Sequence, residues 1–290
     1  MSISPAIVAL VTDIQTHLTW FQGLILGIVQ GLTEFLPISS TAHLKVVPVM
    51  LGWGDPGSSY TAVIQLGSIA AVIWFFWGDL CQLGKGTWRA LEDRNWTDHD
   101  FRVSLGILFG TFPILAGGLA IKVFLPDYDR SPLRSLAAIA TVSIVMALLL
   151  GLAEQLGRRK KSFEQLTMLD GILMGCAQTL ALIPGVSRSG STLTAGLFQG
   201  IERSAAARFS FLLGIPAITL AGLVELKDLI DTQISAQDWL PIGMGFLSAL
   251  VSSYLAIAWL LRYLQTQNTW VFVAYRLAFG IAIGIYIFQG

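Results

Sequence analysis

Six apolar stretches long enough to cross a bilayer restrict what this sequence can fold into. A membrane-spanning helix needs about 20 predominantly apolar residues, because the hydrocarbon core is about 30 Å thick. Charged residues make up only 12% of the chain, whereas soluble domains carry about 25%. Lipid must therefore be the solvent for much of the surface, and we predict an all-α integral membrane protein with one membrane domain, residues 1–290. The predicted spans are residues 60–80, 103–125, 134–156, 207–226, 239–263 and 270–288.

Two further apolar stretches are too short to span the bilayer and are interrupted by proline. Residues 20–36 are followed by Pro37 and residues 168–183 by Pro184, and small or polar residues come next in both cases. Lipid cannot satisfy the exposed backbone groups of such a break, so the break must lie inside protein or against a water-filled cavity. We therefore predict two re-entrant helix pairs, in addition to the six transmembrane helices. The short apolar pieces that complete the pairs are residues 44–51 and 193–200.

Basic residues predict the orientation, because Lys and Arg are enriched in cytoplasmic loops. Two basic clusters follow the first and third predicted spans, so we expect both to face the cytoplasm. The first re-entrant pair then enters from outside, the second from inside, and both termini lie outside. The first fifteen residues lack the features of a cleavable signal sequence, and the absence of a basic face argues against nucleic-acid binding. The clusters are Lys85, Arg89, Arg94 and Arg102, and Arg158, Arg159, Lys160 and Lys161.

An internal repeat divides the chain into two halves. Residues 23–32 align without gaps on residues 171–180 at an offset of 148, and Leu66-Gly67 matches Leu213-Gly214 at an offset of 147. Each half contains one re-entrant pair and three spans, so the halves must have opposite orientation. We predict an inverted-topology repeat, with repeat 1 at about residues 18–156 and repeat 2 at about 166–288. Such repeats place their site near the membrane midplane, where broken helices meet.

The first break gathers polar groups of the kind that perform acid–base chemistry. Gln30 and Glu34 are four residues apart and so share a helix face. An ionisable side chain such as Glu34 within an apolar segment is costly unless it is paired or solvated, and it marks a functional site. The hydroxyls and the imidazole that follow offer a nucleophile and a group that exchanges protons near neutral pH. These residues are Ser39, Ser40, Thr41 and His43.

The second break has the composition of an anion-binding loop. Glycines beside serines allow backbone N–H groups to approach an anion closely, and the helix that follows adds its positive N-terminal end. Arg188 lies in the middle of the loop, and a guanidinium suits two-pronged contact with phosphate. The two breaks together predict a hydrolase site for a phosphate ester or anhydride. The polar residues of the second break are Ser187, Arg188, Ser189 and Thr192.

Other functions fit parts of this pattern. Inverted repeats with broken helices are typical of secondary transporters, and a lipid flippase could bind a diphosphate without cleaving it. We favour an enzyme because transport requires neither a nucleophile nor a proton acceptor. Arg276 in the last span is more readily explained by pairing inside the protein, or by reaching the interface, than by reaction.

Together the two breaks resemble the bacterial undecaprenyl-diphosphate phosphatase family, which is linked with bacitracin resistance. The resemblance rests on the motif from Gln30 to His43 and the motif from Pro184 to Thr192. It implies hydrolysis of undecaprenyl diphosphate to undecaprenyl phosphate and inorganic phosphate in the bacterial inner membrane, at a site that faces the periplasm or the cell exterior. It also implies a divalent cation, Mg²⁺ or Ca²⁺, held by Gln30 and Glu34, although many members have Glu at the position of Gln30.

The resemblance also assigns roles to individual residues. Ser40 and His43 fall on positions implicated in catalysis, and Ser187, Arg188 and Thr192 fall on the phosphate-binding loop. We predict that Glu34, Ser40, His43 and Arg188 are catalytic and that Ser39, Thr41, Ser187, Ser189 and Thr192 bind the substrate. We expect Ser40 to attack phosphorus while His43 accepts its proton. Attack by water or by His43 stays open. Besides the substrate we expect bilayer lipids as partners, and the sequence is compatible with a homodimer.

Overall fold

Apolar sequence with few helix breakers makes nearly every described segment helical. The computed structural model describes residues 18–54, 56–125, 127–128, 131–230 and 238–289, so the predicted lack of a signal sequence concerns residues outside the described ones. Apart from one isolated bridge, these residues contain no β-structure. The α-helices are α2 (Trp20–Phe35), α3 (Ser40–Met50), α4 (Ser58–Phe75), α5 (Trp77–Glu92), α6 (His99–Phe124), α7 (Leu136–Leu156), α8 (Met168–Gln178), α9 (Arg188–Phe198), α10 (Arg203–Ile230), α11 (Trp239–Thr266) and α12 (Trp270–Gln289).

The long helices confirm an all-α membrane protein, with one correction. Five of the described helices, α6, α7, α10, α11 and α12, are long and apolar enough to span a bilayer, and α4 with α5 forms a sixth candidate. The first span was expected at residues 60–80, but α4 ends at Phe75 and the chain bends by 61° into α5. Phe76 at the bend is buried and packs near Phe211, while α5 is polar from Asp79 onward. The chain therefore turns aside, and Lys85 and Arg89 lie on a helix rather than in a loop.

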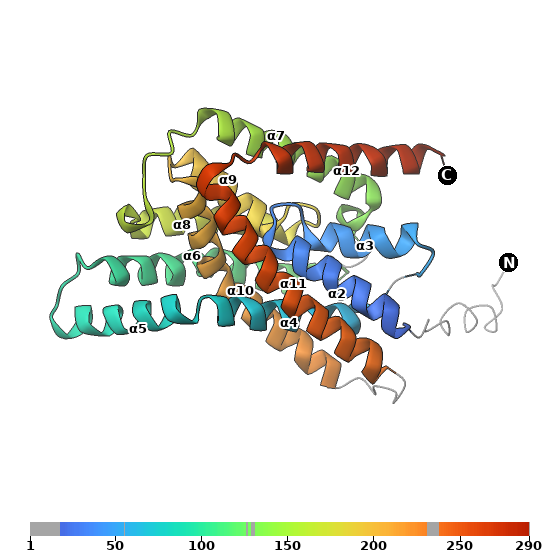
Figure 1. Ribbon diagram of the computed structural model, residues 1–290, viewed down its shortest axis with the longest axis horizontal. Helices are drawn as coiled ribbons and strands as arrows, with labels where there is room; N and C mark the ends of the chain where they lie inside the picture. The colour runs from blue at the N-terminus through green and yellow to red at the C-terminus, as the bar shows by residue number, and fades with distance from the viewer. Residues whose placement is uncertain (1–17, 55, 126, 129–130, 231–237, 290) are drawn as a thin grey trace.

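Two short helix pairs enter the molecule from opposite ends. In Figure 1, α2 and α3 occupy the right half, α8 and α9 the left half, and the turns within the two pairs approach each other near the centre. The helix starts follow the sequence repeat closely, because α2 and α8 begin at residues 20 and 168, and α3 and α9 span residues 40–50 and 188–198. Each of these starts differs by 148 residues, the offset of the sequence match.

Glycines bring the re-entrant helices close to the long ones. A Cβ on Gly27 of α2 would lie 2.2 Å from the carbonyl oxygen of Gly245 in α11, and a Cβ on Gly175 of α8 would lie 2.0 Å from that of Gly110 in α6. Small residues allow such close backbone approach in membrane proteins. Gly27 and Gly175 are equivalent in the sequence repeat, so the repeat retains residues that fix the packing of each broken helix.

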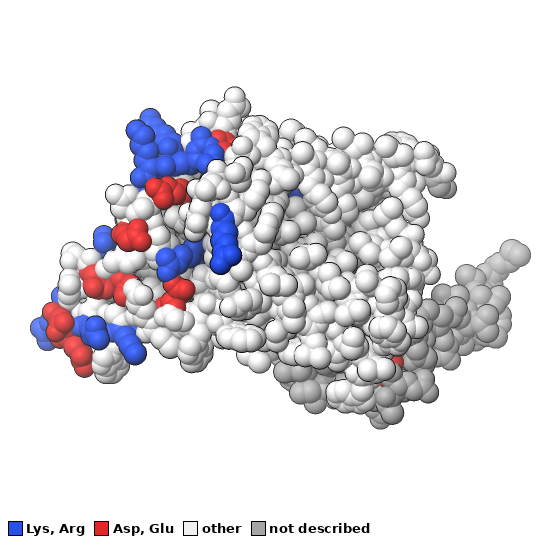
Figure 2. Space-filling view, in the orientation of Figure 1, with Lys and Arg blue, Asp and Glu red and all other residues white. Residues whose placement is uncertain are grey.

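Charged residues gather at one end of the molecule. Figure 2 shows most of the visible Lys, Arg, Asp and Glu at the left, over the tips of α5 and α6 and around the loop after α7, whereas the rest of this face shows very few charged atoms. Glu154 at the end of α7 is buried there, and it pairs with Arg159 and Arg203 and accepts a hydrogen bond from the Thr269 hydroxyl at 2.9 Å. These contacts join α7, α10 and the turn before α12.

Candidate active site

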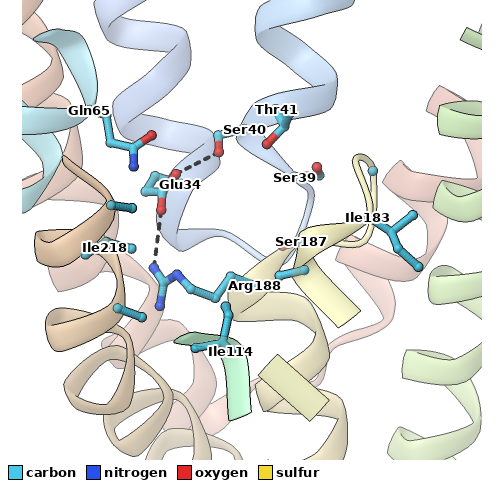
Figure 3. Close-up of a pocket in the computed structure, with 14 residues that line it drawn as sticks. Glu34, Ser39, Ser40, Thr41, Gln65, Ile114, Ile183, Ser187, Arg188 and Ile218 are labelled. Carbon is cyan, nitrogen blue, oxygen red and sulfur yellow. Dashed lines mark hydrogen bonds and ion pairs between the residues drawn. The ribbon is translucent and has the colours of Figure 1, made fainter. Parts of the chain in front are cut away.

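A cavity of about 190 Å³ lies where the turn between α2 and α3 meets the turn between α8 and α9. Figure 3 shows side chains from both pairs pointing into it, with Glu34 and Ser40 on one side and Arg188 on the other. The cavity joins polar groups from both halves to apolar groups of α6 and α10. Its lining residues are Glu34, Ser39, Ser40, Thr41, Gln65, Ile114, Ala181, Ile183, Gly185, Ser187, Arg188, Ala217, Ile218 and Ala221.

Glu34 is the carboxylate at the centre of this cavity, and hydrogen-bond donors from both repeats reach it. Its Oε2 accepts hydrogen bonds from the Ser40 hydroxyl at 2.7 Å and from Gln30 Nε2 at 3.2 Å. Its Oε1 pairs with Arg188 Nη2 at 3.3 Å. The Glu34 and Arg188 side chains are only 10% and 9% exposed. Ser40 therefore has a proton acceptor in place within a largely buried ion pair.

Arg188 keeps part of its binding capacity unused. Its Nε and Nη1 are buried and have no hydrogen-bond partner among the described residues. The guanidinium lies against Gly214 of α10, where a Cβ would stand 1.7 Å from Nη1. Gly214 thus provides the space that lets Arg188 reach the cavity. Arg188 thus brings a guanidinium to the cavity lining, and such a group is suited to an anionic ligand.

Two helix N-termini point toward the same cavity. Ser39 and Ser187 precede α3 and α9 in nearly the same strained conformation, with φ of 77° and 72°. The hydroxyl of each accepts a hydrogen bond from a backbone N–H of the first turn, at 3.4 Å from Ala42 and 3.1 Å from Gly190. The partial positive charge of a helix N-terminus favours an anion there. Ser39, Thr41 and Ser187 line the cavity, as expected for substrate-binding residues.

Ser189 and Thr192 lie near the cavity but do not line it. The Ser189 hydroxyl donates to the carbonyl oxygens of Leu36 at 3.0 Å and Glu34 at 3.3 Å, which ties the second break to the first. Thr192 is fully buried, and its hydroxyl donates to the Arg188 carbonyl oxygen at 2.9 Å and forms a hydrogen bond with the Ser210 hydroxyl. The contacts of both residues hold the loop rather than face a ligand.

His43 does not contact the Ser40 hydroxyl. Its Nδ1 lies 2.7 Å from the carbonyl oxygen of Ser39, and its Nε2 lies 2.7 Å from the Tyr275 hydroxyl. Its ring stacks on Phe279 with centroids 4.2 Å apart, and the side chain is buried. Because a carbonyl oxygen only accepts, Nδ1 carries the proton, and Nε2 accepts from Tyr275. His43 therefore links the start of α3 to α12.

Arg276 connects the two breaks through hydrogen bonds to their backbone carbonyl oxygens. This side chain is 1% exposed and donates to the carbonyl oxygens of Pro37 at 3.1 Å, Val186 at 3.0 Å and Gly185 at 2.7 Å. A fourth hydrogen bond reaches the carbonyl oxygen of Ser143 in α7 at 3.3 Å. Of the two explanations offered for Arg276, these contacts support pairing inside the protein over reaching the interface. One guanidinium fixes the first break, the second break and α7 together.

Two residues that were not predicted belong to this site. Gln65 lines the cavity from α4, and Figure 3 shows it beside Glu34. An amide in the middle of an apolar span was the signal that could have identified it. Gly214 was noted only as part of the repeat, since a glycine gives no sequence sign of the guanidinium that it accommodates.

Comparison with known proteins agrees with these motifs. The family model described as bacitracin resistance protein BacA matches residues 23–282. A protein of Nostoc sp. named undecaprenyl-diphosphatase is 67% identical over 262 residues, covering 90% of this chain and 82% of the relative. A protein of the same name from Synechococcus elongatus is 64% identical over 264 residues, covering 91% and 92% of the two chains. The chain therefore belongs to the bacitracin resistance protein BacA family.

Proposed function

We propose that this chain hydrolyses undecaprenyl diphosphate to undecaprenyl phosphate and inorganic phosphate, which returns the carrier lipid to cell-wall synthesis. The observation that carries the proposal is the convergence of Ser40, Glu34 and Arg188 in one cavity, with the serine hydroxyl 2.7 Å from the carboxylate. The names of the relatives support the same substrate. A nucleophile, a proton acceptor and a cationic group are what phosphoryl transfer requires.

In the first step, Ser40 Oγ attacks the terminal phosphorus atom. The bond from this phosphorus to the bridging oxygen breaks, undecaprenyl phosphate leaves, and the hydroxyl proton passes to Glu34 Oε2. Arg188 and the N-termini of α3 and α9 stabilise the charge that spreads over the equatorial oxygens. The proton then moves from Glu34 to the departing phosphate.

In the second step, water attacks the phosphoserine. Glu34 takes a proton from this water and returns it to Ser40 Oγ as the bond between phosphorus and Oγ breaks. Inorganic phosphate and the original hydroxyl result. The same carboxylate acts in both steps because it bonds the serine oxygen directly.

The contacts of His43 favour Glu34 as the proton acceptor. Both ring nitrogens of His43 are engaged, one by the Ser39 carbonyl oxygen and one by the Tyr275 hydroxyl. Through the Ser39 carbonyl oxygen, His43 stabilises the strained backbone that directs Ser40 at Glu34. We therefore infer that His43 positions the nucleophile.

The oxygen donors of the cavity fit a divalent cation only in part. Glu34 supplies one carboxylate and Gln65 could add an amide oxygen. Gln30, which was predicted as a metal ligand, is buried outside the cavity lining and turns its amide nitrogen to Glu34. Mg²⁺ binds through one or two carboxylates together with water and substrate phosphates, so a cation here takes most ligands from the diphosphate. When bound, it would neutralise charge on the diphosphate.

We also propose the topology and orientation of the chain. The equivalent helix starts and the opposite directions of the two re-entrant pairs support an inverted repeat. Positive residues mark the cytoplasmic side of membrane proteins, so the charged end faces the cytoplasm and the α2–α3 pair opens to the periplasm. The chain then lies in the bacterial inner membrane, with its site served from the periplasm.

Purified protein in detergent tests the function directly. We expect phosphate release from farnesyl and undecaprenyl diphosphates, and no release by Ser40→Ala. Rapid acid quench with terminally labelled substrate should trap phosphate on Ser40 and none in the variant. Turnover without a trapped phosphoserine would favour attack by water. Ion-coupled anion uptake into liposomes without phosphate release would instead indicate a transporter.

A further inference from the structure

The carboxylate of Glu34 has little capacity left for a cation while it pairs with Arg188. Oε2 accepts hydrogen bonds from Ser40 and Gln30, and Oε1 accepts one from Arg188. A carboxylate offers about four lone-pair directions, so three of them are in use. The remaining one lies on Oε1, the oxygen that the guanidinium already occupies.

A dication on that last position would lie beside another cation. Mg²⁺ sits about 2.1 Å from its oxygen ligands, which places it within about 5.4 Å of Arg188 Nη2, given the 3.3 Å ion pair. The two cations repel strongly at this separation inside a protein. No cluster of three His, Cys, Asp or Glu side chains that could compensate occurs among residues 18–54, 56–125, 127–128, 131–230 and 238–289.

We propose that the divalent cation reaches this site as a complex with the diphosphate, and that the protein holds no cation of its own before the diphosphate arrives. This inference rests on the proposed function. The diphosphate supplies negative charge beside Arg188, which lines the cavity, and it brings the oxygen ligands that a hard cation requires. Binding of the cation and of the diphosphate is therefore coupled, and each raises the affinity for the other.

Gln30 determines whether the site needs the diphosphate in order to hold a cation. Its Nε2 lies 3.2 Å from Glu34 Oε2, one helical turn away. In Gln30→Glu, the new carboxylate would stand beside Glu34 and the two would share a cation. The variant should therefore hold a divalent cation in the absence of diphosphate. The substitution replaces the amide nitrogen of the side chain with an oxygen, so the variant side chain has the same shape as the wild-type one.

Equilibrium dialysis with Mn²⁺, detected by electron paramagnetic resonance, tests the proposal. The protein is kept in a zwitterionic detergent, with and without the probe methylenediphosphonate, a diphosphate analogue that cannot be hydrolysed. The Glu34→Gln variant measures the Mn²⁺ that binds to surface carboxylates. Without the probe, the wild type should retain no more Mn²⁺ than Glu34→Gln. With the probe, it should retain about one ion per chain, and Gln30→Glu should retain about one ion with no probe.

Three results would overturn the proposal: one Mn²⁺ per wild-type chain without the probe, no gain when the probe is added, or no retention by Gln30→Glu alone. Phosphate release from farnesyl diphosphate is measured on the same wild-type preparation. If that preparation releases no phosphate, the proposed function fails. If it turns over and yet retains Mn²⁺ by itself, only the present inference fails.

Discussion

Gly214 is the position at which the smallest change should have a large effect on catalysis. A Cβ there would stand 1.7 Å from Arg188 Nη1 and 2.6 Å from Cζ, whereas non-bonded atoms prefer about 3.5 Å. In Gly214→Ala the guanidinium must therefore shift by about 1.8 Å, which changes its position relative to Glu34, with which it pairs at 3.3 Å. A misplacement of about 1 Å can cost about 100-fold, and losing one preorganised stabilising group costs about 100- to 1,000-fold.

We therefore expect Gly214→Ala to lower kcat/KM for farnesyl diphosphate by about 100- to 1,000-fold, or about 3–4 kcal/mol. Phosphate release gives kcat/KM, and a thermal melt in detergent reports folding. Gly284→Ala in α12 is the matched control, because a Cβ there meets nothing within 4 Å. If the effect acts through Arg188, Gly214→Ala combined with Arg188→Ala should be no worse than Arg188→Ala alone. Near-normal kcat/KM in a folded Gly214→Ala protein would refute the reasoning, as would losses that multiply in the double variant.

Four further predictions concern the supports of the site and the topology. Arg276→Lys cannot reproduce four carbonyl contacts, so kcat/KM should fall at least about tenfold, and Tm should drop because buried carbonyl groups lose partners worth about 1–3 kcal/mol each. Tyr275→Phe removes a hydrogen bond from a positioning histidine, so it should lower kcat by less than about tenfold; a complete loss would restore that histidine as a catalytic acid or base. Glu154→Gln leaves Arg203 without its buried partner and should lower the free energy of unfolding by about 3 kcal/mol, read from the melting temperature. Lys160→Cys in an otherwise cysteine-free chain should resist a membrane-impermeant maleimide in intact cells, and rapid labelling would reverse the proposed orientation.

Local sequence patterns predicted the broken helices because the physical cause of each break is local. Pro37 and Pro184 with their polar neighbours cannot continue a lipid-facing helix, and the turns between α2 and α3 and between α8 and α9 lie there. The end of the first span was not predictable in this way, since residues 72–78 remain apolar throughout. There the decisive contact is tertiary: Phe76 packs against a residue of α10 rather than facing lipid.

The sequence identified most residues of the cavity but not how they pair. Ser40 and His43 are three residues apart and looked like a nucleophile with its base. On α3, however, His43 turns toward Tyr275 and Phe279, more than 230 positions away in the chain. Glu34 contacts Ser40 instead, because the sharp turn at Ser39 folds α3 back on α2. Contacts between distant segments therefore decided which group receives the proton.

The place of Arg276 in α12 has a consequence for biosynthesis. The backbone carbonyls of both turns depend on a side chain of α12, which follows α2, α3, α8 and α9 in the chain. Because a membrane protein is inserted from its N-terminus as it is made, the two turns cannot lock against each other until α12 has been synthesised and has docked. A nascent chain that lacks α12 therefore carries every cavity-lining residue and still lacks the ordered centre, so activity begins only after α12 is in place.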